Sequence, residues 1–162
     1  MLLPTLPVKL EPNTAESLRL VSEIRGLAFI DDDSLCLEYT VETVASALLG
    51  KMGGGGRVHN VRLPLHQLSQ VEYKNYYVSA LLRVLPARLS VLKDMHGVQE
   101  NRLSLTIKRR DRDLAKQYAS HINLRIAELR LEQLDQASDK DFLPPRGDDT
   151  LPGREDPQLP EH

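Results

Sequence analysis

The chain has 162 residues, of which 41% are hydrophobic, and a formal net charge of −2 at pH 7. This length suits one domain with tails, and the hydrophobic fraction is large enough for a buried core. The near-neutral charge argues against a general role in coating nucleic acid, which requires a strongly basic surface. The single cysteine, Cys36, excludes an intramolecular disulfide and any zinc site built from several cysteines.

Proline and charge mark both ends of the predicted domain. Residues 1–13 contain three prolines and little periodic pattern, so we expect an N-terminal extension there. Residues 135–162 contain eight acidic residues, three basic residues and five of the ten prolines. Such a segment buries too little apolar surface to offset the entropy of ordering, which predicts a disordered acidic tail. The domain is therefore expected at residues 14–134. We also expect a cytoplasmic protein without a signal peptide or membrane span.

Between these ends, the pattern predicts a series of β-strands at short spacing. Leu18–Ile30 is typical of an extended strand that bends at Gly26. Asp31–Ser34 has the chemistry of a hairpin turn, and Leu35–Val41 alternates apolar and polar residues as a second arm would. Further strands are expected at residues 57–65, 68–77 and 80–91, while residues 43–49 fit either a short helix or a strand extension.

The clearest local signal lies in residues 102–134. Leu103, Leu105 and Ile107 alternate with polar residues, and the period becomes helical at Asp111, the predicted N-cap. One apolar stripe of this helix would close against the sheet, and its members are Leu114, Tyr118, Ile122, Ile126 and Leu129. The predicted fold is therefore mainly β with a C-terminal α-helix that caps a barrel or sandwich.

The same helix carries a second apolar seam, formed by Leu124, Ala127, Leu131 and Leu134. One stripe is sufficient to cap a small barrel, so this seam is the candidate protein interface. Its three–four–three spacing spans fewer than two heptads, which is too short for a stable coiled coil by itself. Two interpretations remain open, because the seam could pack on the chain's own loops or bind a protein partner or a second copy.

Four cationic residues surround the predicted junction between the last strand and the helix, namely Lys108, Arg109, Arg110 and Arg112. The amino terminus of a helix favours anions, which makes these residues a candidate anion-binding site. In an extended segment, however, Arg109 faces away from Lys108 and Arg110, so the four are not expected to share one ligand. Asp111 and Asp113 also place carboxylates at the amino terminus of the helix, where an anion would otherwise bind. A solvated charged turn is the competing interpretation.

No recognised pattern of reaction chemistry occurs in the sequence. Gly53–Gly56 leads into a predicted strand and lacks the Gly-Lys-Ser/Thr end of a phosphate-binding loop, which favours a mobile surface connection. No two histidines have the spacing of a helical metal site. We therefore expect a non-enzymatic protein with no cofactor and no metal. An enzyme would require residues such as His66 and His121 to converge in a pocket.

Three segments resemble the bacterial pleckstrin-homology-like (PH-like) domains of uncharacterised function, and these segments are Val61–Tyr73, Leu85–Gly97 and Leu103–Ala115. The resemblance covers about residues 18–130. It implies two bent antiparallel sheets that form a barrel capped by one long helix, and binding instead of catalysis. Phosphoinositide-binding members place Lys and Arg across the first hairpin, whereas this chain has Asp31, Asp32 and Asp33 there. This difference argues against lipid binding at that hairpin.

The function expected from the sequence is a binding or assembly module that engages a protein partner, or a second copy, through the C-terminal helix or a sheet edge. The alternative is a sensor of anions or anionic membranes that uses the basic strand–helix junction. Nucleic acid is not expected as a partner.

Overall fold

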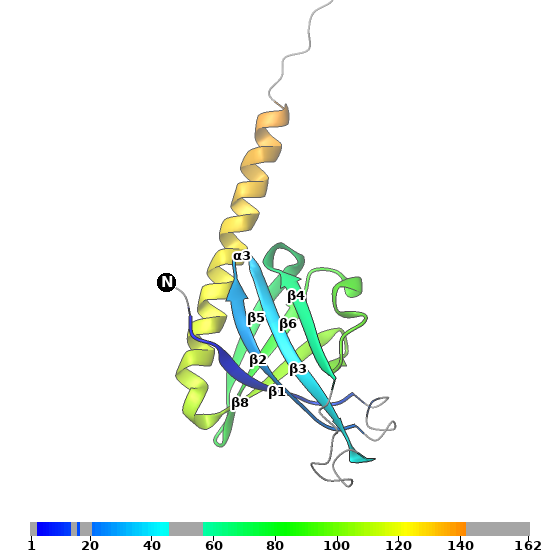
Figure 1. The fold of residues 1–162 in the computed structure, drawn as a ribbon. Coiled ribbons are helices and arrows are strands. Elements are labelled where there is room, and N and C mark those ends of the chain that lie inside the picture. The colour runs from blue at the N-terminus through cyan, green and yellow to red at the C-terminus, as the bar shows by residue number, and fades with distance from the viewer. Residues whose placement is uncertain (1–2, 14–15, 17–20, 46–56, 142–162) are drawn as a thin grey trace, which may run out of the picture.

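The computed structural model describes residues 3–13, 16, 21–45 and 57–141, which form an antiparallel sheet and one long helix (Figure 1). The strands are β1 Leu6–Leu10, β2 Val21–Asp31, β3 Ser34–Thr43, β4 Val58–Pro64, β5 Leu68–Asn75, β6 Ser79–Pro86, β7 Val98–Gln99 and β8 Arg102–Lys108. The short 3-10 helices are η1 Leu65–Gln67, η2 Leu89–Leu92 and η3 Arg109–Asp111, and the long helix is α3 Arg112–Asp141. The predicted fold class, mainly β with a C-terminal helix, is confirmed.

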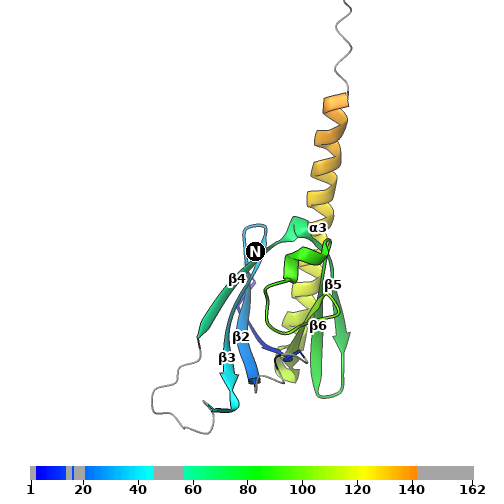
Figure 2. The same cartoon turned by 90° about the vertical axis from the view of Figure 1, so that its right-hand side faces the viewer.

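The strands form one continuous sheet in the order β4-β3-β2-β1-β8-β6-β5, and β7 pairs with β8. The two expected sheets are the two halves of this sheet, one made of β1–β4 and the other of β5, β6 and β8. The halves are joined by the residue pairs Lys9–Thr106 and Leu10–Leu105. Within the described residues β4 and β5 lie at opposite ends of the sheet, which is therefore not closed. Figure 2 shows α3 beside β5 and β6.

The hairpin of β2 and β3 follows the prediction. Its turn contains Asp32 at a φ of 49°, a left-handed conformation that aspartate tolerates better than most residues. Gly26 lies inside β2, opposite Tyr39. A Cβ atom at Gly26 would lie 2.5 Å from the Glu38 carbonyl oxygen and 2.6 Å from the Tyr39 Cβ. Glycine is needed at this position because the two strands approach closely.

The N-terminal segment differs from the prediction of an extension outside the domain. Residues 6–10 form β1, which pairs with β2 along its whole length and with β8 over two residues. Leu6 and Leu10 are fully buried, and Val8 is nearly so. Their alternation with Pro7 and Lys9 is the period of a half-buried strand. The domain therefore begins before residue 14, because these apolar side chains complete the core.

The first half of α3 packs against the sheet as predicted. Tyr118, Ile122 and Ile126 are buried in the core, and Leu114 and Leu129 pack against it. The helix continues to Asp141, so residues 135–141, predicted as part of the disordered tail, are helical. No glycine or proline interrupts the sequence before Pro144, so the chain has no early stop signal for the helix. Residues 142–162 and Gly53–Gly56 lie outside the described residues.

Three other boundaries differ in detail. Strand β6 ends at Pro86, and the predicted strand residues up to 91 enter η2 instead, because proline cannot donate to a strand ladder. Between the predicted strand at residues 80–91 and the last strand, Val98–Gln99 form the short β7, which pairs with β8. Strand β3 ends at Thr43, residues 44–45 are helical, and residues 46–49 lie outside the described residues.

Candidate functional site

The predicted seam of α3 lies on the surface. Leu124, Leu131 and Leu134 have exposed fractions of 61%, 62% and 63%, and Ala127 is also exposed. The C-terminal part of α3 extends beyond the sheet, as both cartoon views show (Figures 1 and 2). The described loops of the chain therefore leave these four side chains exposed, and the interpretation of the seam as packing against such loops is not supported.

One flank of the seam is fastened to the edge strand β5. The Asn123 side chain accepts a hydrogen bond from the Val71 N–H at 2.8 Å and donates one to the Val71 carbonyl at 2.7 Å. Arg130 donates to the Ser69 carbonyl at 2.7 Å and to the Leu68 carbonyl at 3.4 Å. These contacts satisfy outward-facing backbone groups of an edge strand, so α3 blocks further strand pairing there.

A group of ion pairs anchors α3 to the turn between β2 and β3. Arg125 Nε and Nη2 donate to the two carboxylate oxygens of Asp33 at 2.6 and 3.1 Å. Nη1 of the same guanidinium reaches Glu128 at 2.9 Å and Glu132 at 3.3 Å. The hydrogen bond from Arg125 holds the pKa of Asp33 below its ordinary value, and the Asp33 carboxylate is the main cause of the raised pKa of Arg125. Arg125 thus links the seam-bearing helix to the acidic first hairpin.

The four cationic residues of the predicted anion site have separate contacts. Arg110 Nε pairs with Asp111 at 3.2 Å. Arg109 lies over the Tyr77 ring at 5.6 Å from its centroid, and Arg112 donates to the Tyr77 carbonyl at 3.3 Å. Lys108 instead lines a cavity with residues of β1 and β2. The four cationic side chains therefore have different neighbours.

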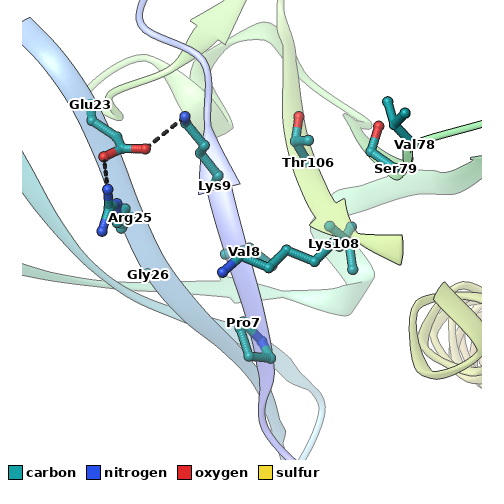
Figure 3. Close-up of a pocket in the computed structure, with 11 residues that line it drawn as sticks. Pro7, Val8, Lys9, Glu23, Arg25, Gly26, Val78, Ser79, Thr106 and Lys108 are labelled. Carbon is teal, nitrogen blue, oxygen red and sulfur yellow. Dashed lines mark ion pairs between the residues drawn. The ribbon is translucent and has the colours of Figure 1, made fainter. Parts of the chain in front are cut away.

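The cavity that Lys108 lines lies between β1 and β8 and has a volume of about 400 Å³. Its residues come from β1, β2, β6 with the preceding turn, and β8, and they are Pro7, Val8, Lys9, Glu23, Arg25, Gly26, Val78, Ser79, Thr106, Ile107 and Lys108 (Figure 3). Glu23 pairs with Lys9 at 2.6 Å and with Arg25. Hydrogen bonds from these two cations lower the pKa of Glu23. Sequence reasoning missed this cavity because it depends on pairing between distant strands.

A second cluster that the sequence did not reveal joins Tyr39, His59 and His96. The Tyr39 and His59 rings are stacked at a centroid distance of 5.3 Å, and the His59 and His96 centroids are 4.7 Å apart. Tyr39 Oη lies 3.1 Å from His96 Nδ1 and accepts a hydrogen bond from the His96 N–H at 3.4 Å. Burial raises the pKa of Tyr39. The pKa of His59 is lowered, mainly by burial and to a smaller extent by the charge of the neighbouring His96.

Glu16 holds the backbone of Gly97, the residue that follows His96. Its carboxylate accepts hydrogen bonds from the Gly97 N–H at 3.0 and 3.2 Å. It also accepts one from the Asn13 N–H, while the Asn13 side chain accepts from the Glu16 N–H, both at 2.8 Å. This reciprocal arrangement is a capping box. We assign the aromatic cluster and Glu16 a structural role, because their contacts hold residues 96–97 against β3 and the N-terminal segment.

The histidine pair considered from the sequence is not the pair whose rings meet. Among the described residues, the two histidines in ring contact are His59 and His96. His66 lies in η1 beside a hollow lined by η2 and Gln133, and His121 is exposed on α3. No group of three or more His, Cys, Asp or Glu side chains in the described ranges is arranged to hold a metal ion. Cys36 is buried, and burial raises the pKa of its thiol.

Comparisons with known proteins give no further guide. No protein-family model, no curated protein and no solved structure matches this chain. Of the helices that the structure describes, none combines the length and the apolar character required to cross a membrane.

Proposed function

We propose that this protein is a non-enzymatic binding module with a PH-like architecture, which engages a partner protein through the exposed seam of α3. The observation that supports this most directly is the exposure of Leu124 and Leu131, at 61% and 62%, on a helix that extends past the sheet. Contiguous exposed apolar side chains are typical of interaction surfaces. Apolar residues at helical spacing are the anchors used when one helix packs against another.

The two flanks of the seam suggest the chemistry of this partner. Asn123 and Arg130 lie on one flank, where they hold β5. Glu128, which also accepts a hydrogen bond from Arg125, and Asp135, which is exposed, lie on the other flank. A partner helix with an apolar seam and basic flanking residues complements this acidic side. Such a helix is the occupant that we propose.

A second copy of the chain fits the seam less well. In an antiparallel pair, the acidic flanks formed by Glu128 and Asp135 would face each other. In a parallel pair, the acidic flank would face the flank of Asn123 and Arg130, whose side chains are already bonded to β5. Both arrangements lose the charge complementarity that a basic partner helix provides.

The size of the seam is consistent with moderate affinity. Complete burial of each leucine contributes about 1.5–3 kcal/mol. The loss of translational and side-chain freedom on association opposes this gain. A seam with three leucines therefore supports micromolar binding instead of a permanent complex.

The test compares Leu131→Glu with Leu89→Glu, a control that makes the same change at a leucine of η2 with an exposed fraction of 77%. Proteins captured by the wild-type chain are identified by mass spectrometry, and the leading candidate is purified and titrated by calorimetry. We expect its affinity to fall at least tenfold for Leu131→Glu and to stay unchanged for Leu89→Glu.

Light scattering across a concentration series is the companion measurement. Equal affinity of the wild type and Leu131→Glu for every purified candidate would contradict the seam proposal. A wild-type dimer that Leu131→Glu dissociates would replace the basic partner helix with a second copy.

A further inference from the structure

The cavity beside Lys108 has a specific origin in the sequence. Pairing between β1 and β8 includes Leu10–Leu105 and Lys9–Thr106 and then stops. The next pairs in this register would be Val8–Ile107 and Pro7–Lys108. Because Pro7 has no N–H to donate, the ladder cannot continue through that position. The two strands therefore separate, and the cavity occupies the space between them (Figure 3).

The backbone of both strands is oriented toward this space. Pro7 is paired with Leu27 of β2. A residue without an N–H cannot exchange hydrogen bonds directly with its opposite neighbour, so its flanking residues make the bonds to β2. The alternation of an antiparallel ladder then turns the Pro7 carbonyl away from β2, toward β8. By the same alternation from the Lys9–Thr106 pair, the backbone of Lys108 is turned toward β1.

The walls of the cavity are apolar and its rim is cationic. Pro7, which is partly exposed, and Val78, which is exposed, supply apolar surface, and the volume of about 400 Å³ falls in the range of ligand sites. Lys9, Arg25 and Lys108 provide three positive charges against the single carboxylate of Glu23, an excess of two.

Lys108 differs from the other cations of the rim. Glu23 is bonded to both Lys9 and Arg25, whereas no carboxylate among the residues that the structure describes pairs with Lys108. The Lys108 side chain is exposed and extends from β8 toward β1, past Val8 (Figure 3). Lys108 is thus the cation in this cavity that is available to a ligand.

We propose that this cavity binds an extended acidic segment of a partner protein, in which a carboxylate side chain lies next to an apolar one. The carboxylate pairs with Lys108, the apolar side chain packs against Pro7 and Val78, and the peptide backbone lies along the separated strands. Glu23 disfavours a phosphate group, because a dianion would lie close to an existing carboxylate. This proposal concerns a different surface from the α3 seam and does not depend on it.

The acidic tail of the same chain is a poor occupant on grounds of length. Helix α3 has 30 residues and begins beside the cavity, so its end lies about 45 Å away. Asp149 follows Asp141 by eight residues, which span at most about 29 Å. Glu155 would reach the cavity only if the connecting chain were almost fully extended. A separate protein avoids this entropic cost.

The test uses the full chain and a fluorescein-labelled peptide, Gly-Ser-Glu-Val-Glu-Ser-Gly, in an anisotropy titration at low salt. We expect saturable binding that weakens about tenfold for Lys108→Gln, which removes one charge-assisted contact. Lys116→Gln, the same change at an exposed lysine of α3, should leave the affinity unchanged, as should Leu131→Glu. A peptide with lysine in place of both glutamates should not bind.

Four results would overturn the proposal. The first is a lack of saturable binding to the wild type, and the second is an equal loss of affinity for Lys108→Gln and Lys116→Gln. The third is Lys108-dependent binding to phosphatidylserine vesicles that the peptide does not displace. The fourth is a gain of tenfold or more in peptide affinity when Glu155, Asp156 and Glu161 are replaced together by their amides, which would identify the chain's own tail as the occupant.

Discussion

The two halves of helix α3 both contain leucines but lie in different environments. From Arg112 to Leu129 the helix buries one stripe in the core, with Tyr118 and Ile122 fully inaccessible to solvent. From Arg130 to Ala137 every residue is exposed. Tertiary packing stabilises the first half, whereas the second half depends on helix propensity and on side-chain pairs along its own surface. An exposed helical segment that retains leucines is available for binding in a way that a core helix is not.

The difference between the halves should be largest for apolar truncations. Ile122→Ala removes a fully buried side chain from the sheet-facing stripe and should lower the free energy of unfolding by about 2–5 kcal/mol. Leu131→Ala, in the exposed half, should change it by less than about 0.5 kcal/mol. Urea denaturation followed by circular dichroism measures both values. A similar loss for the two variants would show that Leu131 is buried in solution.

The next largest effect tests the polar contact between α3 and the sheet edge. Asn123→Ala leaves the N–H and carbonyl of Val71 without their side-chain partners and should cost about 1–3 kcal/mol of stability. Hydrogen exchange at the Val71 amide should become faster. Gln117→Ala, at an exposed position of the same helix, is the control and should alter neither quantity. Unchanged exchange at Val71 in the Asn123 variant would mean that this anchor is not formed in solution.

The smallest effect concerns the charged anchor at the border between the halves. Because Arg125 lowers the pKa of Asp33, the ion pair stabilises the fold fully above the ordinary carboxyl pKa of 3.8. This contribution is lost as the pH falls below 3.8 and through the lowered pKa of the folded state. The stability difference between the wild type and Arg125→Met should therefore shrink as the pH falls through this range.

Arg130→Met is the matched control for this pH dependence. Its guanidinium donates to the backbone carbonyls of Leu68 and Ser69, which do not titrate. The difference between the wild type and this variant should therefore stay constant over the same acidic range. If both variants show the same pH profile, the acid sensitivity has a source other than Asp33.

Local periodicity was sufficient to predict the last strand, the first hairpin and the sheet-facing stripe of α3. It was not sufficient for β1, although Leu6, Val8 and Leu10 alternate correctly, because three prolines in residues 1–13 obscured the pattern. The neighbours of β1 in the sheet are β2 and β8, and this long-range choice has no signal in a short window. The extent of α3 was underestimated for a related reason, since acidic composition at residues 135–141 was interpreted as disorder.

The candidate sites also differ in how far they could be predicted from the sequence. The seam was predictable because all its residues belong to one helix with one period. The cavity beside Lys108 and the Tyr39–His59–His96 cluster were not, because each assembles residues from three or more separate segments. Lys108 was identified from its basic neighbours, but its position in the cavity follows from the strand register.

The shape of the cavity beside Lys108 and its affinity for a ligand have different physical origins. The opening between β1 and β8 results from a missing N–H, a covalent property that neither pH nor ionic strength can change. The attraction for an acidic ligand, in contrast, comes from partly solvated charges that salt screens over about 8 Å at physiological ionic strength. A rise in salt should therefore empty the cavity without closing it, so that release of the ligand requires no conformational change in the sheet.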